Sequence, residues 1–360
     1  MPHRPLAVDQ AVKSAIESGA RVIFSLSGGK DSSAAAFAVS EYLDGIGDPP
    51  HLRSSIHADL GTIEWQTTPA FVERIAKQLN TELTIVRRKA GGLIQRWEQR
   101  WASSCRRYEN LETFQLVSPW SSASLRFCTS ETKVAPLGSH IRKAHAGETI
   151  ISIVGIRREE SASRAKSPIS RADARFAPPG NKAGTKMLTW HPILDWSSED
   201  VFAFHRDRDI PLHEAYALGS TRLSCSYCVL SSLNNLSVAA ASPGNHETFR
   251  RIVALESRSG FSFQNTRWLA DVAPQLLDDA AKAATAKART LADQRRSLEA
   301  TLPPDLRFKR GWPPRIPDRR EAHTIAKVRA EILAAHSLEN RWPRPADVQR
   351  RFEELHSAIK

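Results

Sequence analysis

The sequence lacks the features that mark membrane-spanning and disulfide-stabilised proteins. No apolar run approaches 18 residues, the length that a spanning helix needs. The N-terminal segment MPHRPLAVDQ has no apolar stretch typical of a secretory signal. Only 4 cysteines occur among 360 residues, too few for a disulfide framework. We therefore expect a cytoplasmic protein with no membrane partner, whose cysteines bind a metal, act in catalysis or lie in the core.

Acidic residues are also scarce relative to basic ones. The chain has 51 Lys and Arg against 39 Asp and Glu, a formal net charge of +12, and its pI is about 9.8. Hydrophobic residues make up 41% and charged residues 25%, as in ordinary globular proteins, which excludes a wholly disordered chain. The charge balance favours polyanionic partners, namely nucleic acids or nucleotides.

Short apolar segments alternate with helical patterns over the first 90 residues. Residues 21–26 (RVIFSL) are rich in β-branched and aromatic side chains and predict a buried strand, whereas 33–43 is Ala-rich and predicts a helix. The same patterns predict strands at 52–58, 81–86 and 149–154 and a helix at 64–80. Strands separated by helices of this length indicate a mostly parallel α/β sheet flanked by helices.

Changes in composition predict two domains, 1–240 and 241–360. Residues 157–189 are rich in Arg, Ser, Pro, Gly and Lys, which predicts a long basic loop, mobile unless a ligand orders it. The C-terminal domain combines Ala-, Lys- and Arg-rich helical patterns with a Pro/Arg segment at 303–320. We therefore expect a helical, basic C-terminal region.

A glycine pair separates the first predicted strand from the helix after it, in the sequence SLSGGKDSS (residues 25–33). Adjacent glycines let backbone N–H groups turn toward an anion, and the helix N-terminus adds its positive dipole end. Lys30 adds a mobile cation, and Asp31 is a candidate Mg²⁺ ligand near the phosphates. The alternative is a glycine-rich turn without a ligand.

This segment is similar to the SGGxDS loop, or PP-loop, of the ATP pyrophosphatases, which cut ATP at the α-phosphate. Downstream motifs resemble the phosphoadenosine phosphosulfate (PAPS) reductase-like branch of that superfamily, with the adenine nucleotide alpha hydrolase-like fold. They are the acidic loop 57–64, RFCT and KVAPL from Arg126 to Leu137, G-x-R-x-x-E-S-x-x-R from Gly155 to Arg164, HPILDW from His191, and G-x-x-R-x-x-C-x-x-C from Gly219 to Cys228. Among its members, DndC-like DNA phosphorothioation proteins are the most similar in motif set.

The resemblance implies a set of site residues. Arg157 and Arg164 would offer bidentate donors to phosphate or sulfate oxygens and, with Lys30 and Asp31, form the catalytic set. Solvated loop arginines are the alternative for Arg157 and Arg164. The nucleotide would contact Ser27, Gly28, Gly29, Lys30, Asp31, Ser32, Asp59, Glu64, Lys133 and Gly155.

The cysteines form a candidate metal site. Cys225 and Cys228 have C-x-x-C spacing, which suits one metal or cluster. The resemblance brings Cys128 near them, and Cys105 remains as the fourth candidate. A [4Fe–4S] cluster is expected, with zinc as the alternative. A redox C-x-x-C pair, with Cys105 as an ordinary core thiol, stays open.

Three functions follow from these residues. The first is an ATP α-pyrophosphatase that adenylates a nucleic acid for sulfur transfer, as in DNA phosphorothioation, with DNA favoured over tRNA and a cysteine desulfurase or other sulfur donor as partner. The second is a sulfonucleotide reductase, which uses a C-terminal cysteine thiolate as nucleophile; no cysteine follows Cys228 here. The third is a non-catalytic nucleic-acid-binding protein that keeps the fold.

Overall fold

The computed structural model describes residues 5–307 and 312–358, which form two compact units. The first unit lies within 1–93 and 124–245, and the second within 94–123 and 246–360. The expected boundary near residue 240 lies close to the end of the first unit. Residues 94–123, which we had assigned to the first domain, belong instead to the second unit. The part of the Pro/Arg segment at 308–311 lies outside the described residues.

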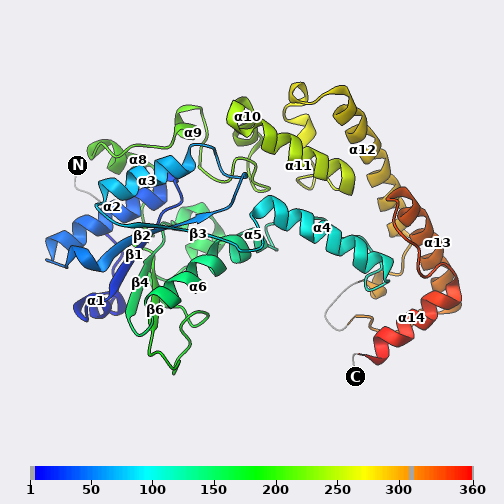
Figure 1. The fold of residues 1–360 in the computed structure, drawn as a ribbon, viewed down its shortest axis with the longest axis horizontal. Helices are drawn as coiled ribbons and strands as arrows, with labels where there is room; N and C mark the ends of the chain where they lie inside the picture. Colours follow the sequence, from blue (N-terminus) through cyan, green and yellow to red (C-terminus); the bar gives the residue numbers. More distant parts are fainter. Residues whose placement is uncertain (1–4, 308–311, 359–360) are drawn as a thin grey trace. The chain divides into compact units, whose positions relative to one another are not determined.

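A six-stranded sheet forms the centre of the first unit (Figure 1). The strand order is β3-β2-β1-β4-β6-β5, and every neighbouring pair is parallel except β5 and β6. The strands are β1 (Arg21–Ser25), β2 (Arg53–Asp59), β3 (Leu83–Arg87), β4 (Thr149–Ile153), β5 (Ser170–Ala172) and β6 (Lys186–Trp190). The predicted parallel α/β sheet is therefore confirmed.

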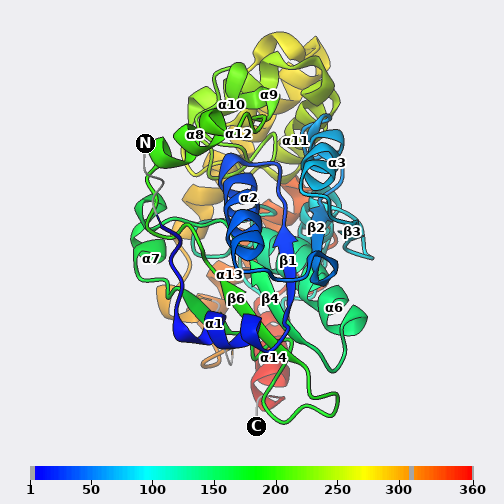
Figure 2. The same ribbon diagram turned by 90° about the vertical axis from the view of Figure 1, so that its left-hand side faces the viewer.

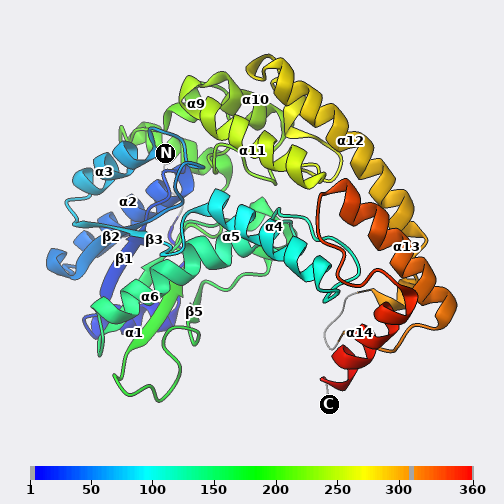
Figure 3. The ribbon, with the colours of Figure 1, turned by 45° about the vertical axis from the view of Figure 1, so that its right-hand side comes forward.

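Helices cover both faces of this sheet. The helices of the first unit are α1 (Gln10–Glu17), α2 (Lys30–Gly45), α3 (Thr68–Gln78), α5 (Phe127–Thr129), α6 (Ala135–Ala144), α7 (Ala162–Ala165), α8 (Ser198–Asp207), α9 (Glu214–Ala217) and α10 (Leu233–Ala241). Helices α2 and α3 lie on one face, with α2 in front of β1 in Figure 2, and α6 lies on the other face in Figure 3.

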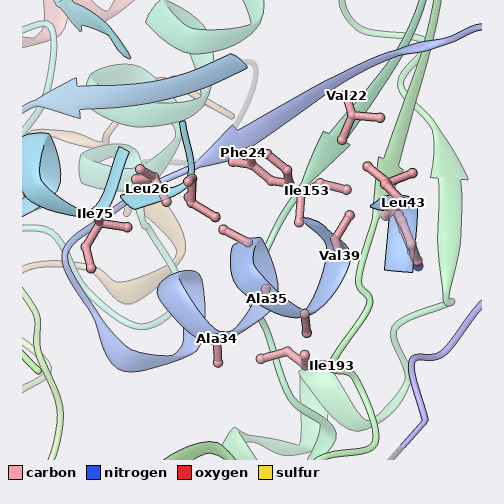
Figure 4. Packing of buried hydrophobic residues seen from close by; sticks show 14 of the residues in the cluster. Val22, Phe24, Leu26, Ala34, Ala35, Val39, Leu43, Ile75, Ile153 and Ile193 are labelled. Atoms are coloured by element: carbon pink, nitrogen blue, oxygen red, sulfur yellow. The ribbon is translucent and has the colours of Figure 1, made fainter. Parts of the chain in front are cut away.

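The side chains of β1 point alternately to the two faces of the sheet, and a separate hydrophobic core lies on each face. Val22 and Phe24 point to the face that α2 covers and pack with Ala35 and Val39 of that helix (Figure 4). Ile23, between them, packs on the other face with a cluster that includes Ile141 of α6. Successive side chains of a strand point to opposite faces, so an unbroken apolar run is what a strand with two covered faces requires.

The stretch 157–189 is not the long loop that its composition predicts. It contains α7, β5 and the first part of β6, and β5 pairs antiparallel with β6 at the edge of the sheet. Met187 of β6 is buried, and the ladder hydrogen bonds to β4 order the segment despite its polar composition. The prediction of a loop was therefore wrong for α7, β5 and the start of β6.

The second unit is helical, as predicted. Its helices are α4 (Leu93–Glu109), α11 (His246–Ser259), α12 (Asp279–Ala300), α13 (Arg319–Ala335) and α14 (Pro345–Ser357). Trp97 of α4 packs edge-on against Trp120 and Phe263, and Arg329 of α13 donates a hydrogen bond to the carbonyl oxygen of Tyr108 at 2.6 Å. These buried contacts group α4 with the C-terminal helices. No helix in the described part of the chain is long and apolar enough to cross a membrane.

Candidate active site

The turn between β1 and α2, residues 27–32, has the geometry of an anion-binding loop, and we call it the PP-loop. Gly28 has a φ of 78°, a left-handed conformation that glycine adopts without strain. Gly29 is the N-cap of α2, and it offers no side chain to cap the helix. The positive end of the α2 dipole therefore lies at this turn, although the N–H groups of Ser32 and Ser33 already donate to the carbonyl oxygen of Gly29.

Two serines brace this turn. Ser32 Oγ accepts hydrogen bonds from the backbone N–H of Ser27 at 3.2 Å and from Ser27 Oγ at 3.0 Å, and it donates to the carbonyl oxygen of Gly29 at 2.8 Å. The loop is therefore held in this shape by its own side chains.

Lys30 and Asp31 form a buried ion-pair network with Arg157. Lys30 Nζ lies 2.9 Å from Asp31 Oδ1 and 5.3 Å from the centroid of the Phe202 ring. Arg157 Nε donates to Asp31 Oδ1 at 2.6 Å, and its guanidinium also pairs with Glu159. Burial opposes the charge on Arg157, but Asp31 and Glu159 raise its pKa above the ordinary value.

This network differs from the roles that the sequence predicts. We expected Lys30 to be a mobile cation at the phosphates and Arg157 to bind an anionic substrate. In the structure the side chains of Lys30 and Arg157 are only 2% and 6% exposed, and both are directed to Asp31. Because α2 begins at Lys30, this side chain starts from a fixed helical position. Asp31 itself accepts hydrogen bonds from both cations.

Two residues that sequence reasoning missed also hold the PP-loop. The Tyr216 hydroxyl accepts hydrogen bonds from the backbone N–H of Lys30 at 3.1 Å and of Leu223 at 3.2 Å, and burial raises the pKa of Tyr216 to about 12. His205 Nε2 lies 2.9 Å from the carbonyl oxygen of Lys30. Both residues lie more than 170 positions from the loop, so no local pattern identifies them.

Gly155, at the end of β4, approaches the PP-loop backbone closely. A Cβ atom at this position would lie 2.3 Å from the carbonyl oxygen of Asp31 and 2.9 Å from the backbone nitrogen of Ser32. Only glycine fits there without moving the loop. The sequence predicts Gly155 as a residue of the site, and the structure gives a steric reason for a glycine at this position.

A cavity of about 420 Å³ lies beside the PP-loop, at the carboxyl ends of the parallel strands, where open α/β sheets bind ligands. Of the predicted site residues, its lining includes Ser27, Ser32, Glu64, Lys133, Gly155 and Cys225. The lining given by the structure does not include Gly28, Gly29, Lys30, Asp31, Asp59, Arg157, Arg164, Cys128 or Cys228. The six predicted residues in the lining come from five separate parts of the first unit.

His57 lines the same cavity and is a third residue that the predicted set lacked. Its Nδ1 lies 2.8 Å from the carbonyl oxygen of Leu26, and its Nε2 lies 3.2 Å from Glu64 Oε2. Burial disfavours a charged imidazole, yet Glu64 raises the pKa of His57 above its usual value. Asp59, by contrast, pairs with Arg87 and accepts from the backbone N–H of Gly61 at 2.6 Å.

Polar residues of β5, β6 and their flanks complete the wall of the cavity. Arg171 and Asp173 come from the segment that composition alone assigns to a loop, and His191 follows β6. Burial lowers the pKa of His191, and the charges of Arg171 and Arg164 lower it further. Arg164 pairs with Glu160. The pairing of β5 with β6 is what brings these side chains to the cavity.

Cys225 is the cysteine that lines the cavity. The backbone N–H and the hydroxyl of the next residue, Ser226, both donate to the carbonyl oxygen of Ile63 at 2.9 Å, which fixes this loop beside the end of β2. Burial raises the pKa of the Cys225 thiol to about 12; Lys133 lowers it, whereas Cys228 and Cys128 raise it. Three of the four thiols thus interact within the first unit.

Cys105 belongs to α4 of the second unit. Burial and Glu109 raise the pKa of this thiol to about 11. Across residues 5–307 and 312–358, no three His, Cys, Asp or Glu side chains are grouped so that they could hold a metal ion. The four-cysteine ligand set for a [4Fe–4S] cluster or zinc therefore stays a prediction.

Comparison with known proteins identifies one family, whose model covers most of the first unit. Residues 21–231 match the model of the phosphoadenosine phosphosulfate reductase domain. A protein of Methanocaldococcus jannaschii, named as uncharacterized, is 27% identical over 204 residues, 57% of this chain and 40% of that protein. An adenosine 5'-phosphosulfate reductase of Neisseria meningitidis serogroup B is 32% identical over 103 residues, 29% of this chain and 36% of that protein.

The match to these relatives is partial. This chain spans less than half the length of each of the two curated relatives. Among solved structures, a phosphoadenylyl-sulfate reductase from Candida auris in complex with phosphate has a TM-score of 0.38 and 13% identity, covering 60% of this chain and 86% of that one.

Proposed function

Because the chain belongs to the phosphoadenosine phosphosulfate reductase domain family, we propose that its first unit binds ATP and adenylates a nucleic acid for sulfur transfer, in the manner of DNA phosphorothioation. One observation carries the proposal: the PP-loop serines Ser27 and Ser32 and the thiol of Cys225 line the same cavity. A nucleotide phosphate and a sulfur centre can therefore meet there.

In the first step, a phosphate oxygen of the nucleic acid attacks the α-phosphorus of ATP. A new P–O bond forms, the bond to the β-phosphate oxygen breaks, and pyrophosphate leaves with the bonding electron pair. Negative charge grows on pyrophosphate, and the positive dipole end of α2 would stabilise it. Lys133, which lines the cavity, supplies the cation that we first expected from Lys30.

Magnesium commonly accompanies ATP and neutralises charge on its phosphates. We expected Asp31 to hold this ion. In the structure its two oxygens accept hydrogen bonds from Lys30 and Arg157, and its role as a magnesium ligand stays a prediction. Glu64 is the carboxylate of the predicted set that lines the cavity, but it lies beside His57. We route no step through the metal.

In the second step, sulfur at the oxidation level of sulfide attacks the activated phosphorus, and AMP leaves with the bonding pair. A cysteine desulfurase or another sulfur donor, with its reductant, would supply the sulfide. Cys225 is the thiol at the position where this sulfur must arrive. Burial raises the pKa of this thiol, which disfavours the thiolate form that acts as a nucleophile.

The second candidate is a sulfonucleotide reductase, which the names of the relatives favour. That reaction needs a thiolate to attack the sulfate sulfur. We favour the ATP reaction on the observation that carries the proposal, namely that Ser27, Ser32 and Cys225 line one cavity.

One experiment separates the candidates. Protein purified anaerobically, with its iron and sulfide content measured, is incubated with ATP and Mg²⁺, alone and with DNA or tRNA, and pyrophosphate is measured. A parallel reaction with PAPS or adenosine phosphosulfate and a thiol measures sulfite. We expect pyrophosphate and no sulfite, and Lys133→Gln should lower pyrophosphate release while Lys13→Gln should not.

The alternative outcomes are distinct. Sulfite release without pyrophosphate release would establish the reductase and overturn the proposal. Neither product, together with no binding of ATP, would favour a non-catalytic nucleic-acid-binding protein. Iron and sulfide in the purified protein, lost on Cys225→Ser, would support the cluster and require the thiols to rearrange from the positions seen here.

A further inference from the structure

A second pocket, strongly basic, lies on the outer side of α6. It has a volume of about 600 Å³ and is lined by the end of β3, the two residues after it and one face of α6. We call it the β3–α6 groove. Its charged lining consists of Arg87, Arg88, Lys89 and Lys143 against the single carboxylate of Glu131, and His140 lies beside them.

The cations of the groove fall into two groups. Arg87 pairs with Asp59, and Arg88 donates to the carbonyl oxygen of Ala90 at 2.8 Å, so both are held by the protein. Lys89, His140 and Lys143 are exposed, and none of the three contacts another described residue through a hydrogen bond or ion pair. These side chains are available to an external anion.

Helix α6 and the turn before it separate this groove from the candidate active site. Val134, Leu137 and Ile141 line the active-site cavity, whereas Pro136, His140 and Lys143 line the groove. Positions three and four apart share one face of a helix, so the two faces of α6 each form the wall of a pocket. An α-helix with its side chains is about 10 Å across, so the pockets are separated by roughly that distance.

The groove also has an apolar surface beside its cations. Ile85 is 47% exposed on β3, which is an edge strand of the described sheet. An exposed apolar side chain next to unpaired lysines matches a ligand that combines phosphates with rings. A single strand with unstacked bases has this character, because its bases can pack against apolar side chains while its phosphates meet cations.

We propose that the β3–α6 groove binds the sugar–phosphate backbone of single-stranded nucleic acid, with phosphates on Lys89 and Lys143 and a base or ribose against Ile85. This inference rests on the proposed function, since it assumes that nucleic acid is the substrate class. It adds where the strand lies: one helix away from the cavity in which its phosphate is adenylated.

The test measures binding of fluorescent 20-nucleotide single strands of DNA and of RNA without ATP, by anisotropy at several salt concentrations. Three full-length proteins are compared: wild type, Lys89→Gln/Lys143→Gln, and the control Lys13→Gln/Lys77→Gln, which removes equal charge from exposed positions of α1 and α3. Each lost phosphate contact on a single strand should reduce the slope of log Kd against log salt by about 0.7. The slope of the groove variant, which lacks two such contacts, should therefore be smaller than that of the wild type by about 1.4. The control should keep the wild-type slope.

The other outcomes bear on separate parts of the proposal. If the salt slope falls equally in the groove variant and the control, net charge alone accounts for binding of the strand. That result would overturn the proposed binding site in the groove. Duplex DNA that binds as tightly as the single strand would overturn the single-strand assignment. If the DNA and RNA strands bind with equal Kd, the groove contacts the backbone features that both share. A difference in Kd above tenfold would show which of the two nucleic acids the groove binds. Pyrophosphate release without any oligonucleotide binding overturns the groove but not the proposed function, whereas groove-dependent binding without pyrophosphate release overturns the function alone.

Discussion

At the scale of single residues, the candidate site depends on close approaches that tolerate little change. Gly155 shows this most clearly, because a Cβ atom there would overlap the backbone of Asp31. We expect Gly155→Ala to destabilise the chain by about 1–3 kcal/mol, as overpacking does. Displacing the loop by even ~1 Å should slow pyrophosphate release by roughly a hundredfold. Urea unfolding and the pyrophosphate assay measure the two effects.

A matched control lies at the other end of α2. A Cβ atom on Gly45 would have no neighbour within 4 Å, and alanine is the better helix former. Gly45→Ala should therefore keep wild-type turnover and leave stability unchanged or slightly improved. Equal effects of the two substitutions would show that the contact between β4 and the PP-loop is not what matters at Gly155.

The ion-pair network makes a second prediction at this scale. Asp31→Ala would leave the buried charges of Lys30 and Arg157 without their shared carboxylate. Removing one partner of a buried pair costs about 3–5 kcal/mol, so the free energy of unfolding of the first unit should fall by that amount. Asp31→Asn, which keeps an oxygen acceptor, should lose less.

A purely catalytic role for Asp31 would give a different result. If Asp31→Ala unfolds in urea like the wild type but releases no pyrophosphate, the carboxylate acts on the ligand and the ion pairs contribute little. A loss of both stability and turnover is what the geometry predicts.

At the scale of elements, α11 contains a buried acid that makes the second unit sensitive to pH. Glu256 is 0% exposed and accepts hydrogen bonds from the backbone N–H groups of Phe263, Leu269 and Ala270. Burial raises its pKa to about 7, although these hydrogen bonds lower it. The folded state therefore holds a proton that the unfolded chain releases between about pH 4.5 and 7.

The sign of the stability change follows from this difference. The free energy of unfolding should fall as pH rises through that window, by at most on the order of 3 kcal/mol from this group. In Glu256→Gln the pH dependence of urea unfolding between pH 5 and 8 should be flatter than in the wild type. Identical pH dependence in both proteins would show that Glu256 ionises as in the unfolded chain.

At the scale of the whole molecule, the two units give a prediction about where a nucleotide acts. The cavity is lined by residues of the first unit only. ATP at a hundredfold excess over its Kd should stabilise the folded state by about 2.7 kcal/mol. Hydrogen exchange should slow in β1, the PP-loop and the turn at Gly155.

The helices of the second unit act as the internal reference for that measurement. Exchange in α11, α12 and α13 should stay as it is without ATP. Protection that appears in these helices and not around the PP-loop would mean that the nucleotide binds elsewhere and that the cavity is not its site.

Local sequence was sufficient for the parts of the fold that depend on neighbouring residues. The strand 21–26 and the helix after the glycine pair are both present, close to their expected ends. Each depends on interactions within one turn or one strand, namely a run of apolar side chains or a left-handed glycine. Composition and local pattern contain that information.

Only the tertiary structure decided how these pieces meet. It directed Lys30 and Arg157 to Asp31, brought Tyr216 and His205 to the PP-loop, paired β5 with β6 and assigned residues 94–123 to the second unit. These contacts join positions far apart in the chain. Whether a cation pairs with a carboxylate or faces a ligand depends on which group the fold places within reach, because burial leaves a charge no water to replace a missing partner.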